Sequence, residues 1–345
     1  MHEPNAMQDT IRIRNLWKLF GGNPSLNIER RRHDHSVRIA VEDVSLSVKE
    51  GEIFIIMGLS GSGKSTLLRM LNGLIEPTSG SVEVLGQDLA SLSRTEWILL
   101  RRQTMAMVFQ SFALFPNRSA LENAEFGLEV AGMPKGKRVC RAKEALERVG
   151  LGNDLHRKPS QLSGGMRQRV GLARALALDP PILLMDEAFS ALDPLIRRDM
   201  QDLLLDLQKE QQRTVVFVSH DLDEAVRLGD RIALMKEGQM LQCDSAEALL
   251  LHPAGDAVSE FFEGVDRASV LNLGAILANQ TTASIVAANE DHPNQQRPSL
   301  KASTLLSDAI PYIADVNGPV DVINDEDQVI GAVSPQGLLK AIARP

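Results

Sequence analysis

Apolar and polar residues alternate along the first part of the chain with the two-residue period of β-strands. This alternation covers residues 10–16 and 37–48, and an uninterrupted apolar run follows at residues 53–57. These patterns are typical of half-buried and fully buried strands, respectively. The stretch between the first two strands contains Gly, Pro, Asn and several charges, which predicts an irregular insertion at residues 21–36.

Between residues 117 and 180 the apolar residues recur every three or four positions, as they do on one face of a helix. Strand-length apolar runs return at residues 181–185, 214–219 and 231–235, and an amphipathic helix is predicted over residues 195–211. Strands that alternate with helices favour an α/β fold with a largely parallel sheet covered on both faces. We therefore expect the helical block to be an insertion into that fold.

Composition excludes several classes of protein. The chain has 345 residues, of which 43% are hydrophobic and 24% charged, so it is expected to fold rather than to stay disordered. Its net charge of −8 and its aromatic content of 4% argue against a nucleic-acid partner. No apolar run approaches the ~18 residues of a membrane span, and the start shows no signal-peptide pattern. With only two cysteines, the chain is expected to work in the cytosol.

The same patterns predict how the chain divides into domains. Residues 1–264 carry the strands and helices named so far. Residues 265–300 include a stretch rich in Asn, Pro and Gln, which is typical of a linker. Residues 301–345 are predicted to form a helix, two short strands around an acidic turn, and a last helix. We expect this tail to be a small α+β module.

A glycine-rich segment, GLSGSGKST at residues 58–66, lies between a predicted strand and a predicted helix. It fits the pattern G-x-x-x-x-G-K-[ST] of phosphate-binding loops, and the alternative is a glycine-rich loop without a ligand. Glycines let backbone N–H groups turn toward phosphate oxygens, and the following helix directs its positive end at the same anion. Lys64 is predicted to reach the terminal phosphates of ATP, and Ser65 to bind Mg²⁺. The predicted nucleotide-binding residues of this loop are Gly58, Ser60, Gly61, Ser62, Gly63, Lys64, Ser65 and Thr66.

Two acidic residues, Asp186 and Glu187, follow the apolar strand predicted at residues 182–185. The end of a buried strand lies at the carboxyl edge of the sheet, where doubly wound folds bind their ligands. Asp186 is predicted to bind Mg²⁺, and Glu187 to orient or deprotonate an attacking water. The simpler alternative is that these acids only cap the next helix.

Further motifs narrow the prediction to one family. They are LSGGMRQ at residues 162–168, SALD at residues 190–193, Gln110 at the end of one predicted strand and His220 at the end of another. Their order and spacing resemble the ATP-binding cassette (ABC) ATPases over about residues 10–262. The resemblance implies an ABC-type P-loop NTPase core, with a mostly parallel sheet and an antiparallel β subdomain. The block at residues 117–180 is then the helical subdomain of the family.

The resemblance implies that the chain works as a homodimer. Two copies are expected to sandwich two ATP molecules, each held by the phosphate-binding loop of one copy. Ser163, Gly164 and Gly165 of the other copy are expected to close on the γ-phosphate, since a helix that starts with small residues offers N–H donors to an anion. Asp193 is expected to couple the two sites.

The catalytic residues implied by the resemblance are Glu187, His220 and Gln110. Gln110 is expected to contact Mg²⁺ and the attacking water, and His220 to contact the γ-phosphate and hold Glu187 in line. The expected Mg²⁺ ligands are Ser65, Gln110 and Asp186. Taken alone, His220 fits a buried core histidine better than a catalytic residue, but its place directly after a strand favours the catalytic role.

Aromatic residues are implied at two further contacts. Adenine usually stacks on an aromatic residue just before a glycine, which here points to Phe20 beside Gly21. Trp17 is an alternative stacking residue, and Phe20 fits core packing as well. Residues 112–116 correspond to the region that contacts a short helix of the membrane subunit in related transporters, although packing of the helical block also explains their apolar character.

Longer segments, such as MVFQSFALFP and LLMDEAFSALDPLIRRDMQ, are similar to the ATPase subunits of quaternary-amine importers. The similarity implies that ATP hydrolysis drives uptake of glycine betaine, choline or proline betaine through integral-membrane permease subunits. An extracytoplasmic substrate-binding protein is then an indirect partner, and the chain is peripheral on the cytoplasmic face of the inner (plasma) membrane. An amino acid, sulfate or a polyamine is the alternative cargo. A soluble ABC ATPase that acts on nucleic acid or ribosomes is the alternative class, which the single cassette and the acidic charge disfavour.

The tail resembles half of a CBS regulatory module over residues 322–343. Members that bind nucleotides usually carry an acid where this chain has Gly337, so regulation without a nucleotide, or simple docking, is predicted. The acidic turn at residues 325–327 is a candidate sensor of ionic strength. The basic run at residues 30–32 is expected to be a solvated loop, with anionic lipid or the acidic tail as alternative contacts.

Overall fold

The computed structural model describes residues 9–23, 28, 29, 36–279, 297–316 and 318–343. The chain forms two compact units, residues 1–245 and 246–345. The predicted basic loop at residues 30–32 lies outside the described residues, as does most of the Asn- and Pro-rich stretch of the predicted linker. Among the described residues, no helix combines the length and the apolar character that a membrane crossing demands.

One sheet of the first unit is antiparallel. Its strand order is β2 (Arg38–Lys49), β1 (Asp9–Phe20), β4 (Ser79–Val84) and β5 (Gln87–Asp88). Ile11 and Ile13 alternate with more exposed residues along β1, because successive side chains of a strand point to opposite faces. The predicted antiparallel subdomain is therefore present.

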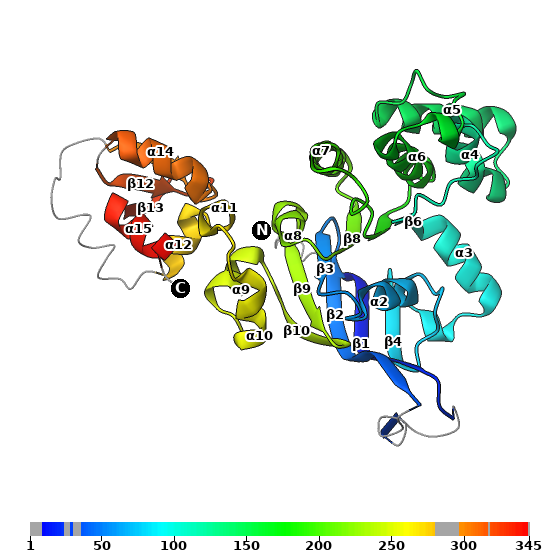
Figure 1. The fold of residues 1–345 in the computed structure, drawn as a ribbon, viewed down its shortest axis with the longest axis horizontal. Helices are drawn as coiled ribbons and strands as arrows, with labels where there is room; N and C mark the ends of the chain where they lie inside the picture. The colour runs from blue at the N-terminus through cyan, green and yellow to red at the C-terminus, as the bar shows by residue number, and fades with distance from the viewer. Residues whose placement is uncertain (1–8, 24–27, 30–35, 280–296, 317, 344–345) are drawn as a thin grey trace, which may run out of the picture. The chain divides into compact units, whose positions relative to one another are not determined.

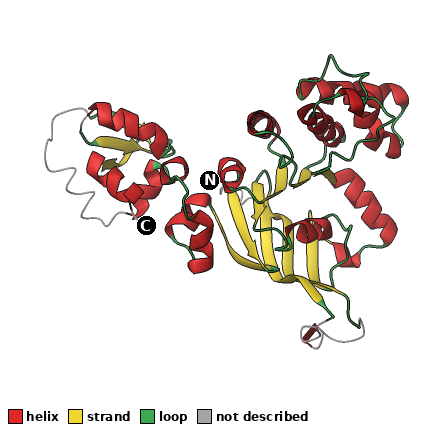
Figure 2. Ribbon diagram, viewed as in Figure 1, coloured by secondary structure: helices red, strands yellow, loops and turns green. Residues whose placement is uncertain are grey.

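The second sheet of the first unit places four strand ends side by side. Its order is β10 (Gln239–Asp244), β9 (Arg231–Lys236), β3 (Ile53–Met57), β8 (Thr214–Ser219), β7 (Ile182–Asp186) and β6 (Met105–Phe109). All neighbours are parallel except β9 and β10. The carboxyl ends of β3, β8, β7 and β6 therefore meet at one edge of this sheet (Figures 1 and 2). The phosphate-binding loop, Gln110, the pair Asp186 and Glu187, and His220 follow these strands, whereas the signature segment at residues 162–168 begins a helix of the helical block.

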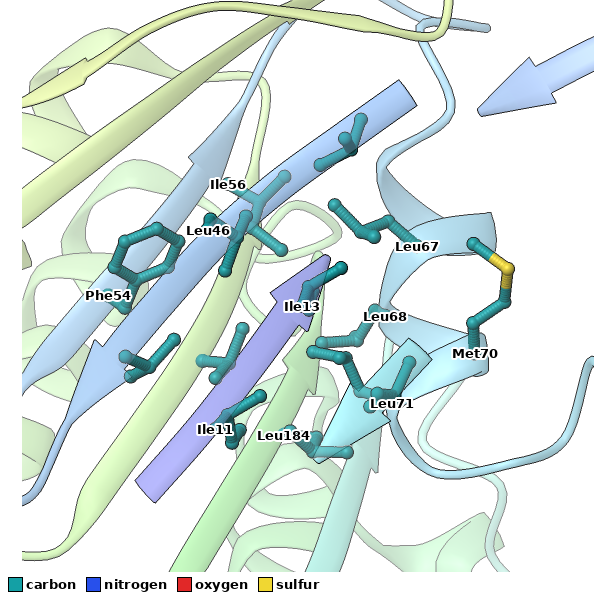
Figure 3. Packing of buried hydrophobic residues seen from close by; sticks show 14 of the residues in the cluster. Ile11, Ile13, Leu46, Phe54, Ile56, Leu67, Leu68, Met70, Leu71 and Leu184 are labelled. Carbon is teal, nitrogen blue, oxygen red and sulfur yellow. The ribbon is translucent and has the colours of Figure 1, made fainter. Parts of the chain in front are cut away.

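Helix α2 (Lys64–Leu71) joins the two sheets through a shared apolar core. Its buried side chains Leu67, Leu68 and Leu71 lie against Ile11 and Ile13 of the antiparallel sheet (Figure 3). The same core cluster includes buried residues of β3, β7, β8 and β9. Burial of a leucine side chain contributes about 1.5–3 kcal/mol, so this packing fixes the start of α2 against the strand ends.

The predicted helical block is present as a subdomain of three packed helices. These are α4 (Ala120–Val130), α5 (Lys135–Arg148) and α6 (Gly164–Ala177), which lie together beyond β6 in Figure 1. Ser119 and Glu122 form a capping box at the start of α4, a sequence-encoded start signal for the block. Three more helices, α3 (Arg94–Thr104), α7 (Pro194–Gln211) and α8 (Leu222–Leu228), complete the helices longer than one turn in the first unit's described part.

The second unit has its own small core. It begins with the short helices α9 (Ala246–Leu251), α10 (Asp256–Ser259), α11 (Arg267–Val270) and α12 (Leu273–Asn279). A three-stranded sheet follows in the order β11 (Ser299–Lys301), β12 (Val320–Ile323) and β13 (Val329–Val333), with α14 (Leu306–Val316) and α15 (Pro335–Ala343). Residues 267–270 and 273–279, inside the stretch predicted as a linker, form helices, and apolar residues such as Leu271 and Leu273 are buried there.

Candidate nucleotide-binding and hydrolysis site

The predicted phosphate-binding loop leads from the end of β3 into the start of α2. Gly63 has a φ of +99°, and a Cβ at this position would lie 2.1 Å from the carbonyl oxygen of Ala40. Only glycine fits such a position. No side chain of the described residues caps the start of α2. Its first N–H groups, which have no partner within a helix, are therefore left for an anion.

Two buried polar groups of this loop suit an anionic ligand. The buried Nζ of Lys64 donates hydrogen bonds to the carbonyl oxygens of Gly58 at 2.7 Å and Leu59 at 2.9 Å. Burial lowers the pKa of Lys64, while the carboxylates of Glu187 and Asp186 act in the opposite direction. The buried Oγ of Ser62 has no hydrogen-bond partner among the described residues. A buried ammonium group and an unpaired hydroxyl fit the charge and the acceptors of a phosphate chain.

The predicted Mg²⁺ ligands Ser65 and Asp186 are in direct contact. Ser65 Oγ, in the first turn of α2, donates a hydrogen bond of 2.7 Å to Oδ1 of Asp186 at the end of β7. Arg69 donates to Oδ2 of the same carboxylate at 3.3 Å. Hydroxyl and carboxylate oxygens are ligands that Mg²⁺ prefers, so the donor set fits this ion. Gln110, the third predicted ligand, donates its hydrogen bonds to Glu187 and Ser190 and not to Asp186.

Glu187 lies between Gln110 and His220. Its Oε2 accepts a hydrogen bond of 3.3 Å from Nε2 of Gln110 and lies 3.3 Å from Nδ1 of His220. Gln110 Nε2 also donates to Ser190 Oγ at 3.1 Å, and that hydroxyl donates to the carbonyl oxygen of Glu187 at 3.0 Å. The His220 side chain is 52% exposed, so it is not a buried core histidine. A carboxylate held by an amide and an imidazole at an open edge fits a general base for water.

The backbone of Glu187 is bent to reach this position. Its φ is +46°, and its N–H donates to the carbonyl oxygen of Val218 at 3.1 Å. A left-handed residue other than glycine costs about 1–3 kcal/mol and persists where its surroundings hold it. The next helix, α7, is capped by Asp193, so neither Asp186 nor Glu187 serves as its cap.

Two of the residues predicted to act across the dimer, Ser163 and Asp193, cap their own helices within the chain. Ser163 Oγ accepts a hydrogen bond of 3.2 Å from the N–H of Met166 and caps α6. Asp193 Oδ1 accepts a bond of 3.1 Å from the N–H of Ile196 and caps α7. A Cβ at Gly165 would lie 2.5 Å from Cγ2 of Ile196, whereas a Cβ at Gly164 would meet nothing within 4 Å. Gly165 is thus needed for helix packing, and Gly164 leaves an open surface at the start of α6.

The two candidate adenine-stacking residues lie on the same strand. Phe20 is the last residue of β1 and is 41% exposed, with Nζ of Lys18 at 5.1 Å from its ring centre. Trp17 is partly buried and pairs with Ser79 of β4. The exposed ring of Phe20 is therefore the more accessible face for a base.

Sequence reasoning missed Ser190 and Arg197 as parts of this site. Ser190 belongs to the SALD segment, but its hydroxyl bridge between Gln110 and Glu187 depends on the folded positions of two loops, one after β6 and one after β7. Arg197 follows Asp193 by one helical turn, a spacing that could have drawn attention to it.

Comparisons with known proteins identify the fold and the family. Residues 41–190 match the family model described as ABC transporter. The chain is 53% identical over 271 residues to ProV, the glycine betaine/proline betaine transport system ATP-binding protein of Escherichia coli (strain K12). That match covers 76% of this chain and 68% of ProV. The chain belongs to the ABC transporter family of ATP-binding proteins.

Two more matches extend this assignment. OpuAA, the glycine betaine transport ATP-binding protein of Bacillus subtilis (strain 168), is 42% identical, and the match covers 96% of this chain and 92% of OpuAA. The first unit's fold resembles the dimeric structure of the bacterial ABC transporter cassette MJ0796, with a TM-score of 0.60 and 37% identity, over 68% of this chain and 98% of that one. These matches confirm the predicted fold class, the binding of ATP and the enzyme class of this cassette protein, an ATPase coupled to transport.

Proposed function

We propose that this cassette protein hydrolyses ATP, as a homodimer, to drive uptake of a quaternary amine through permease subunits at the cytoplasmic face of the inner (plasma) membrane. One observation carries the hydrolytic part: the Glu187 carboxylate is held by Gln110 and His220 beside the contact between Ser65 and Asp186. ProV and OpuAA are described as ATP-binding proteins of glycine betaine transport, and their similarity to this chain supports the proposed cargo.

The roles of the site residues follow from their contacts. The loop at residues 58–66 and Lys64 bind the phosphate chain, and Phe20 stacks on the adenine. Ser65, Asp186 and Gln110 would hold Mg²⁺, which offsets the charge that develops on the phosphates. Glu187 takes a proton from the attacking water, and His220 and Gln110 keep the carboxylate aimed at it.

A second copy of the chain completes each site. The uncapped N-terminus of α2 binds the phosphates from one side, and the start of α6 in the partner, at residues 163–165, closes on the γ-phosphate from the other. The dimeric structure of MJ0796 and the open surface at Gly164 support this arrangement. Asp193 then links the two sites across the dimer.

Residues 112–116 stay the proposed contact with the permease, together with an adjoining pocket whose lining residue Phe126 has its ring centre 4.5 Å from that of Phe115. The volume of the pocket is about 380 Å³, and its lining includes Arg101 and Arg102 of α3, Phe109 at the end of β6, and Phe126 and Val130 of α4. An apolar pocket with a basic rim fits a short amphipathic helix. The loop at residues 111–116 leads from Gln110 to this region, so a shift of the bound helix reaches the site that holds Glu187.

The backbone of the loop at residues 111–116 is held in place by hydrogen bonds, which supports its role in transmitting a movement of the permease. Phe112 and Ala113 have left-handed φ angles of +59° and +46°. Arg174 of α6 donates hydrogen bonds to their carbonyl oxygens, at 3.2 Å and 2.6 Å, and burial lowers the pKa of this arginine. These hydrogen bonds therefore connect the loop to α6, the helix that Ser163 caps.

The tail is proposed to act as a regulatory module. Helix α14, strands β12 and β13 and helix α15 follow one another as in the predicted half CBS module. The exposed residues 325–327 lie between the two strands and remain the proposed sensor of ionic strength. The N–H of Gly337 donates to Ser334 Oγ at 3.1 Å, which is a helix cap and offers no carboxylate for a nucleotide. Docking without regulation is the alternative, which predicts unchanged salt dependence when the acids at 325–327 are neutralised.

One experiment tests the cargo. The full chain is reconstituted with its permease in proteoliposomes, and ATP hydrolysis is measured with binding protein loaded with glycine betaine, choline or proline betaine. An amino acid, sulfate and a polyamine serve as controls. Stimulation by a quaternary amine and not by the controls is expected. Stimulation only by a control would refute the cargo and leave the ATPase assignment standing.

A further inference from the structure

Arg197, in the first turn of α7, contacts two loops that carry candidate catalytic residues. Its NH1 donates a hydrogen bond of 2.8 Å to Oδ2 of Asp221, the residue directly after His220. Its NH2 donates to the carbonyl oxygen of Leu192 at 3.2 Å and lies 3.5 Å from that of Ser190. One guanidinium group therefore joins the loop after β7 to the loop after β8.

The Asp221 side of this contact is rigid. The N–H of Asp221 donates to Ser219 Oγ at 3.0 Å, and that hydroxyl donates to Oε2 of the buried Glu224 at 2.6 Å. Gln201 of α7 donates to Oε1 of Glu224 at 3.2 Å, and Oδ1 of Asp221 accepts the N–H of Glu224 at 3.3 Å. Because buried hydrogen-bond networks are stiff, the residues on both sides of His220 are fixed in place.

The Ser190 side leads to the other partner of Glu187. Ser190 Oγ accepts a hydrogen bond from Gln110 and donates one to the carbonyl of Glu187. Arg197 thus reaches both groups that hold the Glu187 carboxylate, Gln110 through Ser190 and His220 through Asp221. Its own hydrogen bonds go to the loops and not to that carboxylate.

We propose that Arg197 is a positioning residue for ATP hydrolysis, which sets the distance between the loop at residues 187–193 and the loop at residues 219–221. This inference rests on the catalytic roles proposed above for Glu187, His220 and Gln110. The planar guanidinium is suited to the task because its fork of donors binds a carboxylate and carbonyl oxygens at the same time, which an ammonium group cannot reproduce. Without it, the two loops move independently and the Glu187 carboxylate loses its fixed aim.

The chain offers a matched control for this arginine. Arg227 of α8 forms an ion pair with Asp202 of α7. Like Arg197, it therefore links α7 to the segment that follows β8. Its side chain is 29% exposed, against 27% for Arg197, and in both residues Nε is buried without a hydrogen-bond partner among the described residues. Arg227 differs in that its hydrogen bond goes to a helix and not to a catalytic loop.

The test compares steady-state hydrolysis, ATP affinity and thermal unfolding of the full chain in both sets of variants. Arg197→Ala is expected to lower kcat about 10²-fold, the loss that a misplacement of about 1 Å produces. ATP affinity, measured by titration with a fluorescent analogue, is expected to change less than about threefold, because the phosphate-binding loop is untouched. Arg197→Lys should recover only part of kcat. Arg227→Ala should keep kcat within about twofold, as expected for a surface substitution.

A double-mutant cycle sharpens the result. Asp221→Asn keeps an acceptor for the α8 cap but weakens the pair with Arg197. If the two residues act as one unit, the double variant should lose little more kcat than Arg197→Ala alone. Additive losses would mean that the arginine and the aspartate work separately, and would overturn the linking role.

Other outcomes separate this inference from the proposed function. Equal kcat losses in Arg197→Ala and Arg227→Ala, or losses that follow unfolding alone, would show a merely structural role. If Arg197→Ala does not fold, Arg197→Lys provides the test. Full activity of the lysine variant would also overturn the inference. Wild-type turnover in Glu187→Gln would refute the proposed catalytic roles themselves. An inactive Glu187→Gln beside fully active Arg197 variants would refute only the role of Arg197.

Discussion

The phosphate-binding loop (residues 58–66) and the signature loop (residues 162–165) both lead into a helix, but they differ in what their side chains contact. In the first, α2 has no side-chain cap among the described residues, and Ser65 bonds to Asp186 at the end of β7. In the second, Ser163 caps its own helix, and Gly164 borders open space. The first loop is assembled with the candidate hydrolytic residues inside one chain, whereas the start of the second helix borders open space at Gly164.

This difference suggests a division of labour between the two loops. Half of the hydrolysis site is built by strand ends that one sheet brings together, so it forms in every folded chain. The other half that we propose, the start of α6, is also a helix N-terminus, and in this proposal a second copy brings it to the nucleotide. Four predictions test this comparison.

Glu187→Gln should have the largest effect, because it removes the proton acceptor of the first half. We expect a loss of turnover of about 10²–10⁴-fold, the range for a general base, with ATP binding retained. Single-turnover hydrolysis and equilibrium binding of ATP would measure the two quantities. Glu50→Gln, at an exposed residue after β2, is the control and should turn over normally. Multiple turnovers by the Glu187 variant at the wild-type rate would remove the glutamate from the mechanism.

Mixing two inactive variants tests whether the second half comes from another chain. Lys64→Ala disables the phosphate-binding loop, and Gly164→Asp places a negative charge at the open start of α6, where a side chain meets no neighbour. Each variant alone should be inactive. An equimolar mixture should regain about a quarter of the wild-type rate, because half of the dimers are mixed and each of these has one intact site. Failure of every mixture to regain activity, with dimers present by light scattering, would contradict the shared site.

Phe20→Ala should weaken ATP binding by an intermediate amount. Loss of one base-stacking contact costs about 1–3 kcal/mol, or about 5- to 150-fold in Kd. Titration calorimetry on Phe20→Ala and Trp17→Ala, with GTP as a second nucleotide, would decide between the two aromatics. A larger loss of affinity in Trp17→Ala would reassign the stacking role.

The smallest effect is expected in the pH dependence of stability. Burial raises the pKa of Glu224, although its hydrogen bonds from Ser219 and Gln201 oppose the shift. A carboxyl group with a raised pKa in the folded state stabilises the fold most at low pH, and this contribution is lost as the pH rises through the folded-state pKa. Glu224→Gln should therefore flatten the fall in unfolding free energy between acidic and neutral pH. Parallel curves for the two proteins, measured by urea unfolding at several pH values, would contradict this assignment.

Much of the site could be predicted from local sequence because its residues follow strand ends. The loop at residues 58–66, the pair Asp186 and Glu187, and His220 each come directly after an apolar run, and parallel strands bring such ends to one edge. The helical subdomain was also predictable, because its three helices carry clear periodicity and a capping box. The helices at residues 267–279 were missed, since a few short apolar turns beside a polar stretch give no sustained period.

The sequence by itself determined the chemistry of this protein: the phosphate-binding loop, the two acids, the signature segment and the order in which they follow strands. These features are local, because strand and helix periods and glycine-rich loops depend on residues a few positions apart. Only the tertiary structure decided which groups touch. The strand order placed Gln110 and His220 on either side of Glu187 and put Ser190 and Asp221 within reach of Arg197. Such contacts join residues far apart in the chain, and packing of the sheet, rather than any sequence period, brings them together.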